Sequence, residues 1–255
     1  MSPIRSLTIA VATLLVLGAC RPSYPQQIAP LSGPALYDAA LREFERRRWD
    51  NAIMAFERLS RELPARDTLL PRVYLHLGQA HSARNEHLLA AQAFQRIMDS
   101  FPNDTLADDG LLLAGRAYAA MWRRSSLDAE YAQTAVSTLQ TLLALYPNAD
   151  VREEAQHELN ALYDRLANKD YQTGMWYFRN RAFFSAIIYF EDVVERFPDT
   201  PTARLARIRI VEAYRRERWA AQAEDACEAL VAAYPGDREV GELCGAPPPA
   251  AAGTS

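Results

Sequence analysis

The strongest constraint on the fold of this chain is a proline that recurs five times at a fixed distance from an alanine. The alanine stands twelve residues before each proline, and a large apolar residue or a cysteine stands eight before it. A separation of four residues places both on one face of a helix. The prolines are Pro64, Pro102, Pro147, Pro198 and Pro235, the alanines Ala52, Ala90, Ala135, Ala186 and Ala223, and their partners Phe56, Phe94, Leu139, Phe190 and Cys227.

Each repeated position has a packing reason. Alanine lets two helices of a hairpin approach closely, the residue four later fills the groove beyond that contact, and proline ends the helix. This spacing resembles the second helix of a tetratricopeptide repeat (TPR). Gly78 and Gly174, 24 residues before their prolines, and Ala40 in the first unit supply the small residue expected in the first helix. The sequence therefore predicts an all-α TPR solenoid of about five helix-turn-helix repeats.

Two of the five repeats carry extra residues, because the intervals between prolines are 38, 45, 51 and 37. We expect an insertion between Tyr118 and Tyr131 in the third repeat, and an unusually long first helix from Val151 to Asn180 in the fourth. The predicted helices span residues 36–47, 50–62, 71–84, 87–100, 106–122, 129–145, 151–167, 169–180, 182–196, 202–217 and 219–233.

The first residues read as an export signal. Leu7–Leu17 is almost wholly apolar and follows Arg5, but it is about half as long as a membrane-spanning helix. Residues 17–20, Leu-Gly-Ala-Cys, resemble a bacterial lipobox, in which the cysteine is acylated and becomes the first residue after cleavage. We therefore expect residues 1–19 to be a lipoprotein signal peptide and Cys20 to carry a covalent lipid.

The residues after Cys20 suggest a tether and a location. Residues 20–34 are rich in proline, so we expect an extended tether that reaches on the order of 40 Å and holds the folded part away from the lipid. In lipoproteins of diderm bacteria, aspartate after the cysteine commonly signals retention in the inner membrane, and Arg21 stands there instead. The expected location is the outer membrane, on its periplasmic face.

Composition and motifs argue against chemistry. The 28 basic and 32 acidic residues give no basic excess for tracking nucleic-acid phosphates. The four histidines show no metal-ligand spacing, and the chain has no glycine-rich phosphate loop, no GxSxG and no CxxC. We therefore expect no catalytic residue, no metal site, no nucleic-acid partner and no cofactor beyond the lipid on Cys20. The function should lie in surfaces instead.

Three features remain as candidates for sites. Arg204, Arg207, Arg215 and Arg218 fall within about 80° of one another around one predicted helix, a stripe suited to carboxylates of an acidic partner. The alternative is a solvated face answered by nearby glutamates. Trp122, at the edge of the insertion, is the candidate for an exposed contact. Cys227 and Cys244 either form a disulfide or remain a buried residue and a free thiol, and the sequence leaves both open.

Residues 166–219 resemble the BamD family of outer-membrane assembly lipoproteins. The match includes the Leu-Ala start of a long helix, an aromatic pair, Phe-Pro-Asp-Thr at 197–200 and Glu-Ala-Tyr at 212–214. The repeats, the insertion and the lipobox are in keeping with it. The resemblance implies a non-enzymatic subunit of the β-barrel assembly (BAM) machinery that scaffolds BamA and helps to recognise and insert outer-membrane β-barrel proteins.

The resemblance also distributes the expected partners along the chain. Residues 35–102, repeats one and two, would face the C-terminal segments of unfolded outer-membrane proteins. Residues 103–147 form the third repeat with its insertion. Residues 148–240, repeats four and five, would bind the periplasmic (POTRA) domains of BamA, and residues 241–255 are expected to be a disordered tail. Other BAM lipoproteins are further expected partners, although the proline-rich, cysteine-containing C-terminus departs from the family pattern.

A second hypothesis shares the lipobox and the repeats. A periplasmic TPR lipoprotein that coordinates envelope constriction (Tol-Pal-type) or pilus assembly would look the same outside residues 166–219. Co-purification with BamA periplasmic domains separates the two hypotheses.

Overall fold

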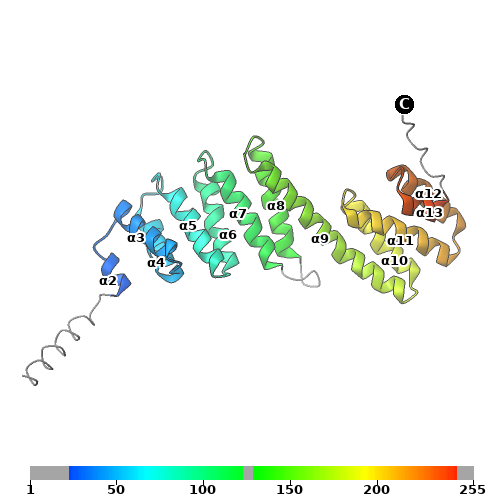
Figure 1. The fold of residues 1–255 in the computed structure, drawn as a ribbon, viewed down its shortest axis with the longest axis horizontal. Coiled ribbons are helices and arrows are strands. Elements are labelled where there is room, and N and C mark those ends of the chain that lie inside the picture. The colour runs from blue at the N-terminus through cyan, green and yellow to red at the C-terminus, as the bar shows by residue number, and fades with distance from the viewer. Residues whose placement is uncertain (1–22, 123–128, 246–255) are drawn as a thin grey trace, which may run out of the picture. The chain divides into compact units, whose positions relative to one another are not determined.

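A computed structural model describes residues 23–122 and 129–245 of the chain. These residues form α-helices only, and successive helices pair into antiparallel hairpins (Figure 1). The all-α TPR prediction is confirmed. The helices are α2 (Tyr24–Ile28), α3 (Gly33–Glu45), α4 (Trp49–Glu62), α5 (Leu70–Ala83), α6 (His87–Ser100), α7 (Ala107–Met121), α8 (Glu130–Leu145), α9 (Arg152–Arg179), α10 (Phe183–Arg196), α11 (Pro201–Glu217), α12 (Ala220–Ala233) and α13 (Arg238–Cys244).

The chain divides into two compact units, Met1–Gly110 and Leu111–Ser255. In the first unit the hairpins α3–α4 and α5–α6 pack against each other through α4 and α5. In the second unit the long α9 packs on α8, α10 and α11, and α12 packs on α11. The long helix that the sequence predicts in the fourth repeat is one continuous helix of 28 residues.

The helices of each hairpin meet where the repeat predicts. The five alanines are almost fully buried, and so are the large side chains four residues later. A Cβ added to Gly78 would lie 2.5 Å from the Phe94 ring, and one added to Gly174 would lie 2.6 Å from the Phe190 ring. Since real Cβ atoms do not approach so closely, these glycines are needed for the hairpins to close. Gly115 has the same role against Leu139 in the third repeat.

Four hairpins share a turn that the sequence analysis missed. Seventeen residues before the repeat proline, a residue other than glycine adopts a left-handed conformation, with φ between 57° and 62°. The residue after it donates its backbone N–H to a carbonyl five residues back, as in Arg48 to Glu43 and Trp219 to Tyr214. This is the Schellman pattern that ends a helix. The left-handed residues are Arg47, Asn85, Arg181 and Arg218.

The expected extended tether is wrong over its described part, residues 23–34. Tyr24–Ile28 form the short helix α2, and Ile28 is 4% exposed in the core of the first unit. Arg58 on α4 fixes the end of this helix, because its guanidinium donates to the carbonyl oxygens of Ile28 at 2.8 Å and Leu31 at 3.0 Å. Apolar burial and these hydrogen bonds outweigh the extended preference of the prolines. Residues 1–22, including Cys20, lie outside the described residues.

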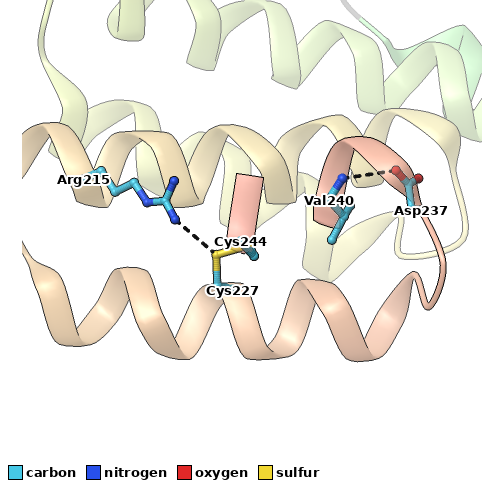
Figure 2. The surroundings of a disulfide bond; sticks show 5 residues. All are labelled: Arg215, Cys227, Asp237, Val240 and Cys244. Carbon is cyan, nitrogen blue, oxygen red and sulfur yellow. Dashed lines mark hydrogen bonds between the residues drawn. A yellow bond between two sulfur atoms is a disulfide. The ribbon is translucent and has the colours of Figure 1, made fainter. Parts of the chain in front are cut away.

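The expected disordered tail is also wrong where it is described. Arg238–Cys244 form α13, and Val240 is buried in a cluster with Cys227 and Leu230. Cys227 and Cys244 form a disulfide, with their Cα atoms 5.5 Å apart (Figure 2). A covalent bond and a buried valine therefore hold a segment whose composition alone predicts disorder. Residues 246–255 of the expected tail lie outside the described residues.

Candidate functional site

The four arginines of the predicted stripe, three on α11 and one just after it, have different environments. Arg204 is engaged within the chain, because its Nε and Nη2 donate to the two carboxylate oxygens of Asp237 at 2.7 and 2.8 Å. Its Nη2 also donates to Glu239 at 2.8 Å. The hydrogen bonds from Arg204, and then that from the Val240 backbone, lower the pKa of Asp237 to about 2. Arg204 therefore holds α13 and does not serve as an open partner contact.

Arg207 is the member of the stripe with an unmet donor. Its Nε is buried and has no hydrogen-bond acceptor among the described residues. The side chain lines a groove of about 320 Å³ between α10, α11 and α12. Val194, Ile210 and Leu230 give this groove apolar walls. An acceptor that entered from outside would satisfy Arg207 while its neighbouring apolar atoms covered the walls.

Polar groups at the rim of this groove limit what it can accept. Tyr214 donates to Glu191 at 2.9 Å, which occupies one carboxylate oxygen. Burial, followed by this hydrogen bond, raises the pKa of Tyr214 to about 12, so the phenol stays protonated at neutral pH. Asp225 and Gln222 also line the groove. The groove therefore combines the Arg207 cation with acidic and amide side chains. Such a mixture of donors and acceptors suits a peptide better than a free anion.

The other two arginines lie toward the end of α11. Arg215 is exposed and its Nη2 lies 3.7 Å from Cys227 Sγ, beside the disulfide (Figure 2). Arg218 is the left-handed residue after α11, also exposed. The stripe is therefore split: Arg204 pairs within the chain, Arg207 opens into a groove, and Arg215 and Arg218 face solvent.

Trp122 is not an exposed contact, and this prediction is wrong. The side chain is 1% exposed within a core cluster of the second unit. Arg165 on α9 covers it, with the guanidinium carbon 4.8 Å from the ring centroid and Nη2 donating to the Trp122 carbonyl at 2.7 Å. The start of the insertion is thus fixed by packing on α9, which sequence spacing does not reveal. The rest of the insertion, residues 123–128, lies outside the described residues.

The structure reveals an exposed apolar and aromatic surface on α10. Phe184 and Ile188 stand one turn apart on α10, 58% and 52% exposed. The Phe184 ring lies 6.1 Å from the ring of Trp219, which in turn lies 5.9 Å from that of Tyr214 at the groove. Apolar surface therefore continues from the groove across α10. Contiguous exposed apolar side chains of this kind are typical of an interaction surface.

The described part of the chain contains neither a metal-ligand cluster nor a membrane-spanning helix. No group of three or more histidine, cysteine or acidic side chains there is placed to hold a metal ion. Among these residues, no helix has the length and apolar character needed to cross a membrane. The features that remain for function are the groove at Arg207, the aromatic surface beside it and the faces of the first unit.

The chain is similar in sequence to a known protein family and to named relatives. A sequence model of the YfiO family, described as outer membrane lipoprotein, matches residues 31–230. A Caulobacter vibrioides protein named outer membrane protein assembly factor BamD is 27% identical over 179 residues, covering 70% of this chain and 58% of the relative. A Vibrio cholerae protein of the same name is 27% identical over 220 residues, covering 82% of this chain and 90% of the relative.

Similarity to solved structures is weaker. A Podosopora anserina putative kinesin light chain with TPR-like repeats is 16% identical, and the match covers 84% of this chain and 97% of that one. Its TM-score is 0.40.

Proposed function

Because the chain belongs to the YfiO family of outer membrane lipoproteins, we propose that it is a non-enzymatic subunit of the machinery that assembles β-barrel proteins in the outer membrane. The observation that carries this proposal is the family match over residues 31–230, together with two relatives named as outer membrane protein assembly factors. Paired helices with extensive exposed surface, and no metal cluster in the described chain, suit a scaffold.

Membrane attachment is proposed to occur through Cys20. The apolar segment Leu7–Leu17, whose last residue is the first of the lipobox, is too short to span a bilayer, so an acyl anchor is the consistent means of attachment. The test is to replace residues 1–20 by an ordinary cleavable signal peptide, so that the exported chain begins at Arg21. The protein should then leave the membrane fraction on a salt wash, while its helical circular dichroism stays unchanged. Mass spectrometry of the wild-type N-terminus should show the added lipid, and an unmodified Cys20 would contradict the proposal.

The second unit is proposed to bind the periplasmic POTRA domains of BamA. Supporting this are the buried, unpaired Nε of Arg207 beside its groove and the adjoining aromatic surface of Phe184 and Trp219. A partner segment with a carboxylate flanked by apolar side chains satisfies both features. A charge-assisted hydrogen bond in a partly dry groove is stronger than a contact on an exposed surface.

The first unit is proposed to receive the C-terminal segments of unfolded barrel proteins, over residues 35–102. Exposed apolar side chains on its second helices, Met54 on α4 and Leu88 and Leu89 on α6, support this. Amphipathic β segments have an apolar face that such side chains can cover. Contacts with other BAM lipoproteins belong to the same proposal.

The decisive experiment is co-purification of tagged protein with the BamA periplasmic domains. Charge reversal by Arg207→Glu should lower recovery at least about tenfold, because it places like charges in the groove. Arg216→Glu is the matched control, since Arg216 is an exposed arginine of the same helix that does not line the groove. Equal recovery from both variants would exclude Arg207 from the interface. Absence of any barrel-assembly subunit from the wild-type eluate would contradict the function itself.

A further inference from the structure

The described chain begins close to the turn between α3 and α4. Tyr24, the second described residue, packs on the core formed by α3 and α4. Its phenol lies near the charges of Arg42 and Glu43, in the last turn of α3. The N-terminal end of α2 is therefore at the same end of the hairpin as the α3–α4 turn. The C-terminal end of α2 points toward Arg58, more than halfway along α4.

This turn is formed by consecutive arginines. Arg46, Arg47 and Arg48 connect α3 to α4 and are all exposed, and Trp49 begins α4. A groove of about 370 Å³ opens at the turn and is lined by residues 47–51 together with Arg84 from the end of α5. Three arginines and one aspartate are the charged residues of its lining. The groove is thus a cationic surface beside an indole ring.

Arg84 is paired with Asp50 and, at 3.1 Å, with Glu86, whereas the arginines of the turn keep much of their positive charge available. Glu43 accepts long contacts from Arg46 and Arg48, both 3.4 Å, and a closer one from the Asn51 amide at 2.7 Å. Both arginine side chains keep 60% of their surface exposed. Arg47 forms no ion pair with any described residue. Because each guanidinium has five N–H donors, the turn presents many donors outward.

An acyl anchor at Cys20 would place this turn at the lipid surface. Only Arg21 and Pro22 separate Cys20 from Ser23, the first described residue. Three residue steps span at most about 11 Å. The folded body cannot then stand off the membrane, because α2 uses the residues that an extended tether would need. The end of the hairpin that holds Ser23 must lie at the headgroups.

We propose that the α3–α4 turn, with Arg46, Arg47, Arg48 and Trp49, is a docking surface for the phosphates of anionic phospholipid headgroups. The orientation of the first unit on the membrane rests on the proposed acylation of Cys20. Arginine forms paired hydrogen bonds with phosphate, and tryptophan favours the depth of the headgroups. The cationic turn would add an electrostatic attachment to the lipid anchor. The second attachment fixes how the first unit faces the membrane.

Vesicle flotation of the mature chain without its acyl group tests the surface itself. The protein begins at Arg21 and is mixed with vesicles of phosphatidylcholine, with or without about a third phosphatidylglycerol. We expect flotation with the anionic vesicles only, and its loss at high salt. Arg47→Gln/Arg48→Gln should lower the partition coefficient at least about tenfold, since each arginine near an anionic surface contributes about a fivefold factor.

Arg61→Gln/Arg66→Gln is the matched control. It removes the same charge from two exposed arginines at the C-terminal end of α4 and just beyond it, away from the turn, and should float as the wild type does. Equal flotation of both double variants, or no flotation of the wild type, would overturn the proposal. Neither outcome bears on BamA co-purification or on the mass of the N-terminus, so failure of this surface and failure of the proposed function are separable.

Discussion

The two ends of the described chain are both closed by a short helix, but by different physics. At the N-terminal end, α2 is held by Ile28 in the core and by the Arg58 guanidinium on backbone carbonyls. At the C-terminal end, α13 is held by a disulfide and by Arg204 on carboxylates. One closure is noncovalent and depends on apolar burial, whereas the other is covalent and depends on charge. The two closures should therefore fail under different conditions.

Reduction should have the largest effect, and at one end alone. Closing a loop of 17 residues by a disulfide contributes about 3 kcal/mol. In Cys227→Ala/Cys244→Ala the amides of α13 should lose about that much protection in hydrogen exchange, while those of α2 keep theirs. Reduction of the wild type with dithiothreitol breaks the disulfide without removing side-chain atoms, so it is the control for any cavity left by the alanines. It should reproduce the loss of hydrogen-exchange protection in α13. Unchanged protection of α13 under both treatments would show that Arg204 and Val240 suffice.

The noncovalent closure should respond most to Arg58→Ala. This change removes hydrogen bonds from a charged donor to the carbonyls that end α2, at a cost of about 2 kcal/mol. Hydrogen exchange of residues 24–31 measures the opening. Arg61→Ala on the same helix is the control, because its one ion pair, with Glu57, is 3.8 Å long. If both variants exchange alike, burial of Ile28 alone holds α2.

Acid should loosen the C-terminal closure next. The pKa of Asp237 is lowered from 3.8 to about 2, so its stabilising charge is complete above pH 4 and is lost as the pH falls toward 2. The amide shift of Val240, whose N–H donates to this carboxylate, reports the transition by NMR. In Arg204→Ala the midpoint should rise toward 3.8. A midpoint that stays near 2 would mean that the Val240 backbone, not Arg204, sets it.

Alkali should loosen the N-terminal closure, with the smallest expected effect. Burial, followed by the nearby charge of Glu43, raises the pKa of Tyr24 from 10 to about 12. Its contribution is therefore complete below pH 10 and is lost as the pH rises through 12. The difference in absorbance at 295 nm between wild type and Tyr24→Phe isolates this phenol. An ordinary midpoint near 10 would show that α2 opens before Tyr24 ionises.

The contrast also shows where sequence reasoning holds. The hairpin helices were predicted closely, since alanine spacing and a stopping proline are local signals that packing then reinforces. Both closing helices were missed. Five residues of α2 and seven of α13 are too short to be stable alone, so they depend on contacts distant in the chain. Their proline-rich surroundings argued for extended or disordered chain instead.

In the candidate site, too, local features were predictable from the sequence and tertiary contacts were not. Helical spacing placed Arg204, Arg207 and Arg215 on α11 correctly, but it does not reveal that Asp237 and Glu239 would occupy Arg204. Trp122 was expected at the surface because an insertion follows it, and only the tertiary contact with Arg165 shows its burial. Gly115 was not identified because the insertion shifts its distance from Pro147. Contacts formed by residues about 40 apart in sequence have no local signature.

The left-handed turns between hairpin helices have a practical consequence for protein engineering. Arg181 and Arg218 occupy backbone angles that favour glycine, at an energetic cost of about 1 kcal/mol each. Replacing both by glycine offers roughly 1 to 2 kcal/mol of added stability in the second unit. These positions form no part of the buried core, so the gain leaves the helix contacts intact. A chain thermostabilised in this way would keep its groove and both closures for crystallisation with a partner.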